Sequence, residues 1–408
     1  MRASSAKSEL IFSEGFFPTE GFNVLLTPLY VRVVLIQADI KIVLVSIEMT
    51  SLPADEIAAL KDIVLRETNA DTCWICVTHT FSAPHVMPDF VLRTDDDKKH
   101  KRDLQAALYN ATRLASADAA SSMVNAKMSI GSDECSVCIN RDIETVDGWW
   151  VGNSGTGATN KTLTAIHIID DANQTIAVLV HYAVQSSVLD GSMMSTGGKA
   201  VSSDLAGTMA AKLEAQIGGT VLFLVGAAGD QAPIGKAKSC KFDQARKLME
   251  YDLQDDGIEI CNTLSDQMVI AATCAIQSAK PVASNEVFVQ DAAVIVPAKE
   301  MKPLHELYPT RIPPYISKGT METPIFLMGL GDITLVGVQP ELNCLTAKEV
   351  TDAHPTALIV TMVNGGAKYM ADKDSYQRIT YEAMNSPFGK GAAEILASKV
   401  KEMLASRP

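Results

Sequence analysis

A histidine follows the apolar run TCWICV, at the point where a buried strand would end. This residue, His79, is followed six residues later by His85, beyond Pro84. The chain offers a wider pool of imidazole, carboxylate and phenol groups that could bind a metal. A catalytic zinc ion needs about three such ligands and one open position. The alternative is that each histidine is a hydrogen-bonded structural residue. The pool comprises His79, His85, His181, Asp190, Asp204, Glu341 and Tyr369.

Other catalytic chemistries have weaker support in the sequence. No serine stands in a G-x-S-x-G elbow. Cys344, in ELNCLTAKE, is the one cysteine placed like a nucleophile, and a buried small hydrophobe explains it better. The pair Cys73 and Cys76 lies within an expected strand, where residues three apart point to opposite faces, which opposes shared zinc binding. Hydrolysis would therefore use a metal-bound water.

One pattern of elements occurs three times and explains where many polar residues stand. Each copy has two apolar strands, a helix and a third strand, over residues 29–83, 163–233 and 324–369. Open α/β sheets build their sites at strand ends. If the three copies share one arrangement, the polar residues after these strands converge on one crevice; otherwise each is only the first solvated residue after a buried strand. They are Glu48, His79, His181, Gln185, Asp230, Glu341 and Asn364.

This pattern predicts an α/β protein with mixed β-sheets, built from three related strand-strand-helix-strand units with helices packed outside. We expect a single domain over residues 1–408, in which the irregular segments 234–256 and 300–322 are candidate lids or insertions. Further helices are expected over 98–124 and 391–404, because apolar residues recur there at helical spacing.

Composition excludes several kinds of partner. The formal net charge of −13 opposes binding to nucleic acid or to an anionic membrane surface. No stretch has the uncharged length of a membrane span, and the N-terminal segment shows no secretion signal. These features predict a cytoplasmic protein with free cysteines. The hydrophobic content of 47% allows a homo-oligomer.

Six segments, in order, resemble the neutral (non-lysosomal) ceramidase family over roughly residues 26–400. They are THTFSAP, CINRD, HYAVQSS with SSDLAG, GAAGDQAP, GVQPELN and the closing NGGAKYMADKDSYQRITYEAMNSPFGKGAAEIL. The resemblance implies the fold of the ceramidase N-terminal domain and a zinc ion, or another divalent transition metal. Its zinc ligands map onto His79, Gln185, Glu341 and Tyr369, with the nearby His181 as a substitute for Gln185.

Three positions depart from the ceramidase pattern. Gln185 replaces a zinc-binding histidine, Phe81 replaces the second histidine of THTH, and Ala232 replaces a serine. A glutamine oxygen is a weaker ligand than imidazole. A long-chain lipid also needs an extended apolar groove, which no segment obviously builds. The departures therefore oppose ceramide as the substrate.

We expect a metal-dependent hydrolase that cleaves a C–N, amide-type bond of a small non-lipid substrate through a metal-activated water. By the resemblance, Arg141 would hold a substrate carboxylate or the developing oxyanion. Asp204 and Asp230 would orient the ligands or carry a proton. Two alternatives remain open: a catalytically altered ceramidase-like protein that binds a small ligand or serves as a subunit, and a metal-free cyclase or isomerase on the same scaffold.

Overall fold

The computed structural model describes residues 1–242 and 248–406, and it contains the three expected units. In the first, β3 (Tyr30–Gln37) pairs antiparallel with β4 (Lys41–Ile47). Helix α1 (Ala54–Thr68) then leads to β5 (Thr72–Val77), which is parallel to β4. The parallel pairing brings the carboxyl ends of β4 and β5 to the same edge of the sheet.

The other two units repeat this pairing. Each has an antiparallel strand pair, then a helix, then a strand parallel to the second one, so the predicted three-unit α/β architecture is confirmed. The second unit is β9 (Thr162–Asp170), β10 (Thr175–Tyr182), α3 (Asp204–Ile217) and β12 (Thr220–Val225). The third is β18 (Ser317–Leu330), β19 (Ile333–Val338), α5 (Cys344–Ala353) and β21 (Ala357–Val360).

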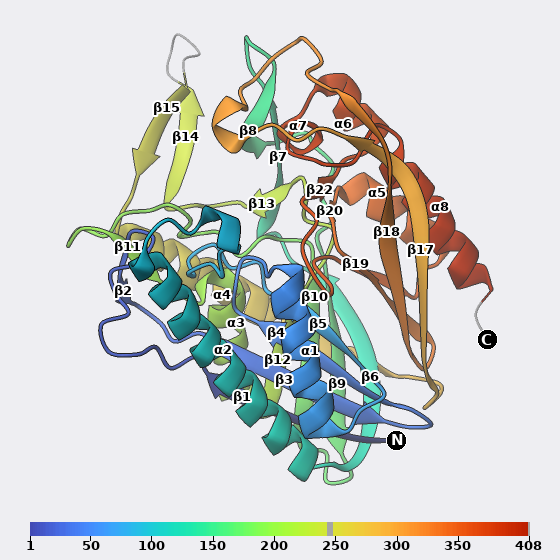
Figure 1. The fold of residues 1–408 in the computed structure, drawn as a ribbon. Coiled ribbons are helices and arrows are strands. Elements are labelled where there is room, and N and C mark those ends of the chain that lie inside the picture. The colour runs from blue at the N-terminus through green and yellow to red at the C-terminus, as the bar shows by residue number, and fades with distance from the viewer. Residues whose placement is uncertain (243–247, 407–408) are drawn as a thin grey trace.

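The sheets surround a shared core (Figure 1). A nine-stranded sheet in the order β12-β10-β9-β6-β1-β3-β4-β5, with β16 on β6, contains the first two units. The order β17-β18-β19-β21 forms the sheet of the third unit. The central cluster joins Leu44, Leu179 and Leu335, one from each unit. Burial of this apolar surface holds the three units together. The additional strands are β1 (Arg2–Glu9), β6 (Val124–Glu134), β16 (Lys280–Pro281) and β17 (Val287–Lys299).

Helices cover the outer face of each sheet, as predicted. Helices α1 and α2 (Asp95–Ser121) pack on the strands of the first unit, and α3 and α4 (Asp256–Gln277) on those of the second. Helices α5 and α8 (Ala392–Ala405) pack on the third (Figure 1). Strands buried on both faces read as continuous apolar runs. Cys73 and Cys76 illustrate the two faces, because the first lies under the helices and the second in the central core.

Short elements complete the fold around the strand ends. The segment 234–256 contains the hairpin β14–β15, which projects from the body in Figure 1; residues 243–247 of this candidate lid lie outside the described residues. The segment 300–322 contains a 3-10 turn, Leu304–Glu306, and the start of β18. The other short elements are β2 (Phe22–Leu25), β7 (Cys138–Glu144), β8 (Trp149–Ser154), β11 (Lys199–Val201), β13 (Gln231–Pro233), β14 (Lys238–Phe242), β15 (Leu248–Asp252), β20 (Glu341–Leu342), β22 (Tyr369–Met370), α6 (Lys373–Arg378), α7 (Tyr381–Met384) and a 3-10 turn, Asp89–Val91.

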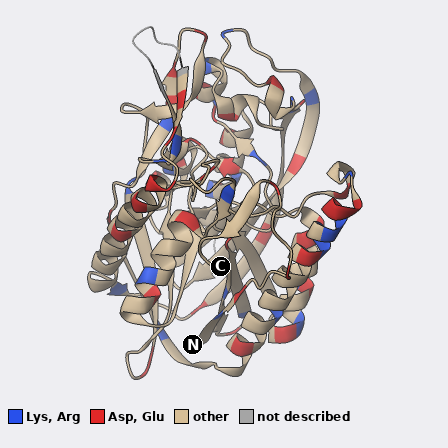
Figure 2. Cartoon of the chain, turned by 90° about the vertical axis from the view of Figure 1, so that its left-hand side faces the viewer, with Lys and Arg blue, Asp and Glu red and all other residues tan. Residues whose placement is uncertain are grey.

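Figure 2 shows acidic and basic residues on the same outer helices, with the acidic ones more frequent in this view. Within the described part of the chain, every helix is too short or too polar to cross a membrane.

Lys299, at the end of β17, is a buried cation that makes stability depend on pH. Its Nζ donates to the Met384 carbonyl at 3.0 Å, and burial lowers the pKa of the ammonium from 10.5 to about 8. Between these values the unfolded chain binds the extra proton, so the free energy of unfolding rises with pH. Relative to Lys299→Met, we expect the wild type to gain up to about 3 kcal/mol between pH 8 and 10.5 in urea denaturation. Parallel pH profiles for the two proteins would contradict this.

Candidate active site

His79 lies in a sharp turn directly after β5. Its backbone is left-handed, with φ of 55°, which is uncommon for a residue other than glycine. Two neighbouring contacts hold this turn: Thr50 Oγ1 donates to the Thr80 carbonyl at 2.7 Å, and the Phe81 N–H donates to the Ser186 carbonyl at 3.0 Å. The strained turn therefore fixes where the imidazole points.

The His79 ring has one nitrogen bonded and one available. Nδ1 lies 2.7 Å from the Thr50 carbonyl, which can only accept, so Nδ1 carries a proton. Nε2 is buried and has no hydrogen-bond partner among the described residues, although Glu341 Oε2 lies 3.1 Å away. Burial opposes the charged ring, but the Glu341 carboxylate outweighs it and raises the pKa of His79. A positive charge at His79 Nε2, beside Glu341 Oε2, is therefore favoured.

Glu341 and Tyr369 stand side by side. Strands β20 and β22 are parallel, with Glu341 opposite Tyr369 in the register, so the two side chains lie on the same face. Both residues are buried. Burial raises the pKa of the Tyr369 phenol, and the nearby Arg141 opposes this effect. Three different groups, an imidazole, a carboxylate and a phenol, therefore lie together.

Gln185, beyond the end of β10, links Glu341 to Arg141. Its Nε2 donates to Glu341 Oε2 at 2.8 Å, and its Oε1 accepts from Arg141 Nη1 at 2.9 Å. A guanidinium only donates, so the amide orientation follows from this network. The oxygen that could bind a metal is thus committed to Arg141. Gln185 orients Glu341, whereas the resemblance assigned it the position of a ligand.

Arg141, on β7, is a buried cation held through two of its three guanidinium nitrogens. Its Nε donates to Glu382 Oε1 at 2.8 Å, and its guanidinium carbon lies 5.1 Å from the ring centre of Tyr369 and 5.7 Å from that of Tyr381. Nη2 is buried without a hydrogen-bond partner among the described residues. Buried donors are rarely left unpaired, so this atom is available to a bound group.

Aromatic rings surround the cluster, and one of them was missed from the sequence. Tyr381 packs against Trp150 and Tyr369, with ring centres 5.5 and 5.8 Å apart. It lies in the segment ITYEAM, directly before Glu382, so the closing ceramidase-like segment did contain a signal. Phe81 packs edge-on against His79 at 4.6 Å. The rings narrow the space over the imidazole and the guanidinium.

Asp204 is a positioning residue behind the cluster. Its carboxylate accepts from the backbone N–H of Val188, Leu189 and Leu205, at 2.9, 3.0 and 2.6 Å, and from Ser82 Oγ at 3.0 Å. These contacts join the turn after Gln185 to the turn after His79. Burial raises the pKa of Asp204, against the effect of these bonds. With four donors on two oxygens, the carboxylate serves to hold loops.

Asp230 is a second buried carboxylate that holds neighbouring segments in place, and it lies beside Arg141. Its carboxylate accepts from the side chains of Asn140 and Gln231 at 3.1 and 3.0 Å and from the Cys344 N–H at 2.8 Å. Its carbonyl accepts the Arg141 N–H at 2.9 Å. Burial raises the pKa of Asp230 to about 6. It therefore supports Arg141 and the start of α5, and it contacts neither His79 nor Glu341.

Several strand-end residues lie outside the cluster. His181 Nε2 bonds the Ile359 carbonyl at 2.7 Å and the ring lines a separate cavity, so His181 does not complete a shell around Glu341 as the sequence had suggested. Glu48 pairs with Arg32, and Asn364 Oδ1 accepts the Ile75 N–H at 3.0 Å. The surface residue His85 pairs with Glu20 at 2.7 Å. The predicted convergence thus holds for His79, Gln185 and Glu341.

His79, Glu341 and Tyr369 fit a metal ion in number and in chemistry. They offer one nitrogen and two kinds of oxygen, and three protein ligands leave the open position of a catalytic site. The Nδ1–H of His79 bonds a backbone carbonyl, an arrangement common for metal-binding histidines. The described residues contain no group of three His, Cys, Asp or Glu side chains that could hold a metal. The third donor here is a tyrosine.

Comparison with known proteins identifies the fold. No protein-family model and no curated protein sequence matches this chain. Among solved structures, a ceramidase complexed with C2 and the neutral ceramidase from Pseudomonas aeruginosa both superpose with a TM-score of 0.74 at 12% identity. The match covers 98% of this chain and 74% and 73% of those chains. The predicted ceramidase-like fold is therefore confirmed over nearly the whole chain.

Proposed function

We propose that the protein is a metal-dependent hydrolase that cleaves the C–N bond of a small amide. The observation that carries the proposal is that His79, Glu341 and Tyr369 are buried beside one another, with His79 Nε2 3.1 Å from Glu341 Oε2. The likeness to solved ceramidases supports the reaction class. The substrate and the dependence on metal are our inference.

The ion, zinc or another divalent transition metal, would be held by His79 Nε2, the Glu341 carboxylate and the Tyr369 oxygen. When bound, such an ion lowers the pKa of water and polarises a carbonyl group. The Thr50 carbonyl keeps the His79 proton on Nδ1, so Nε2 faces the ion with its lone pair. Gln185 holds Glu341 in place from the other side.

Arg141 would bind the oxygen on which negative charge develops. Its Nη2 is free among the described residues, while Nε and Nη1 are fixed by Glu382 and Gln185. A guanidinium already fixed in this way needs no rearrangement during the reaction. Water is largely excluded here, which strengthens the attraction between the guanidinium and an oxyanion.

The closure of the site favours a small substrate. His79, Arg141, Gln185, Glu341 and Tyr369 are each between 2% and 6% exposed. The Phe81 ring lies against the imidazole, where it restricts the approach to the metal ligands. Such burial favours a short amide over an amide that carries a long chain.

Metal analysis tests the proposal directly. We expect about one zinc ion per chain after loading with zinc and dialysis, and loss of that zinc in His79→Ala. The matched control is His85→Ala, which removes another histidine close in sequence but outside the cluster, and which should keep the metal. Small N-acyl amides should be hydrolysed, and Glu341→Gln should abolish this turnover. Absence of metal under every loading condition, or equal zinc in His79→Ala, would contradict the proposal.

A further inference from the structure

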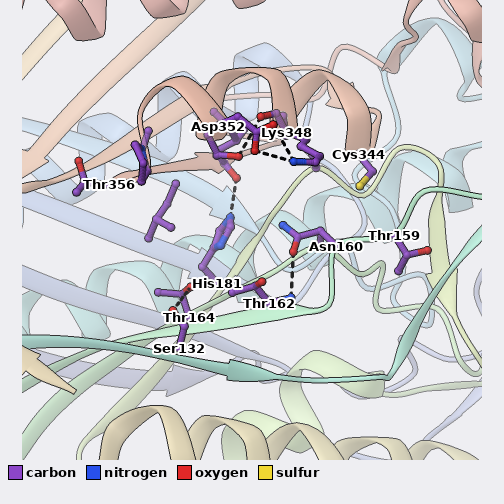
Figure 3. A pocket seen from close by; sticks show the side chains of 18 of the residues that line it. Ser132, Thr159, Asn160, Thr162, Thr164, His181, Cys344, Lys348, Asp352 and Thr356 are labelled. Atoms are coloured by element: carbon purple, nitrogen blue, oxygen red, sulfur yellow. Dashed lines mark hydrogen bonds and ion pairs between the residues drawn. The ribbon is translucent and has the colours of Figure 1, made fainter. Parts of the chain in front are cut away.

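A cavity of about 420 Å³ lies between the second unit and the third (Figure 3). Its floor comes from β6, β9 and β10, and its opposite wall from α5 and the start of β21. The residues that line it are separate from the five of the proposed active site. The cavity is large enough for a small organic molecule.

His181 presents an available acceptor to this cavity. Its Nε2 lies 2.7 Å from the Ile359 carbonyl, and because a carbonyl only accepts, the ring proton is on Nε2. Nδ1 therefore carries a lone pair, and it has no hydrogen-bond partner among the described residues. The side chain is only 8% exposed, and Figure 3 shows the ring at the cavity. Burial lowers the pKa of His181, which keeps the ring neutral.

The rest of the lining is uncharged or internally neutralised. Ser132 Oγ and Thr164 Oγ1 bond each other at 2.9 Å beside the histidine. Lys348 and Asp352 are the charged lining residues, and the Lys348 ammonium donates to both Asp352 oxygens at 2.7 Å. The remaining wall is largely apolar and includes Ile130, Ala183, Ala227, Ala347 and Leu358.

From these features we propose that the cavity is a second binding site, for a small neutral molecule. The ligand would carry an apolar body and an N–H or O–H group that donates to His181 Nδ1. A ligand donor at the cavity would give this lone pair a hydrogen-bond partner. A charged ligand would meet no uncompensated opposite charge in the lining, so neutrality follows from the same observations. This site does not depend on the proposed hydrolysis.

Indole and 1-methylindole form a matched pair of probes, since they share an aromatic body and only indole has an N–H. We expect indole to bind the full chain at one site in calorimetric titrations, and 1-methylindole to bind about tenfold more weakly. His181→Phe, which keeps an aromatic ring but removes the Nδ1 acceptor, should weaken indole binding by a similar factor. A tenfold change in affinity corresponds to about 1.4 kcal/mol, which lies within the range for one hydrogen bond.

Thr351→Trp supplies a variant that does not touch His181. Thr351 lines the cavity from α5, so the larger ring should fill the space and abolish indole binding, while circular dichroism verifies the fold. The proposal is overturned if indole does not bind at millimolar concentration. It is also overturned if 1-methylindole binds as tightly as indole, or if Thr351→Trp leaves indole binding unchanged.

Discussion

Replacing Arg141 with lysine should lower kcat/KM for a small amide by about 10²- to 10³-fold while zinc content stays unchanged. The lysine keeps a positive charge near Glu382 but cannot bond Glu382 and Gln185 together and still present a third donor. The oxygen that Arg141 Nη2 would bind then loses its fixed partner. His79→Ala differs, because it should remove metal and activity together.

Steady-state kinetics and metal analysis on the same preparations separate these effects. Arg113→Lys on α2 is a suitable control, since this exposed arginine lies far from the cluster in sequence and donates to Asn110 Oδ1 at 3.3 Å. A fall of less than tenfold in Arg141→Lys would assign Arg141 a structural role. A loss of zinc in Arg141→Lys would show instead that the Gln185–Glu341 arrangement depends on the guanidinium.

The three units were predictable because their strands are buried on both faces. The run Val33–Ile36 alternates between the outer helices and the central core, so every position is apolar and the end of the strand is visible in the sequence. Helix α4 was missed, since the segment 234–256 before it looked irregular and many of its buried residues are small, such as Ala271, Ala272 and Ala275. The edge strand β17 was also missed, and in its middle half-buried positions alternate with exposed ones.

The site was only partly predictable. Polar residues at strand ends look alike in the sequence, but their side chains point to different parts of the structure. Glu48 directly follows β4 and reaches Arg32, whereas His79 is redirected by a left-handed turn. His181 belongs to β10 itself and lines the cavity between the second and third units. The pairing of Glu341 with Tyr369 depends on a two-residue parallel bridge, β20–β22, which is too short to leave a pattern.

The role of Gln185 also required the structure. The sequence showed that a ligand position had changed, but only the contacts show that the amide joins Arg141 to Glu341. In the proposed site, the amide at position 185 would therefore bridge the Glu341 carboxylate and the Arg141 guanidinium, and it would not act as a metal ligand. The same hydrogen bond holds the Glu341 carboxylate in place.

The buried arginine Arg32 should have the largest effect on stability. It is 2% exposed on β3, donates to Glu214 on α3 at 2.8 Å, and also pairs with Glu48. The Arg32 guanidinium thus links β3 of the first unit to α3 of the second. Arg32→Met would leave two carboxylates in the interior without their cation. We expect a loss of about 3–5 kcal/mol in the free energy of unfolding, measured with urea.

Two comparisons show whether the loss comes from uncompensated charge. Lys7→Met removes the half-exposed partner of Glu214 and should cost about 0–1 kcal/mol. The double variant Arg32→Met, Glu48→Gln should recover part of the loss, because Glu214 keeps Lys7 and the Val221 N–H. A loss below 1 kcal/mol in Arg32→Met, or no recovery in the double variant, would contradict the explanation by uncompensated charge.

The loss should also depend on pH, with a sign set by Glu48. Burial already raises the pKa of this carboxyl, even with Arg32 opposing the effect, and removal of Arg32 raises it further. A carboxyl with a raised pKa holds its proton in the folded state while the unfolded chain has lost it, so stability falls as pH rises above about 4.3. The deficit of Arg32→Met should therefore be smaller at pH 5 than at pH 8, whereas a deficit caused by lost packing would be the same at both.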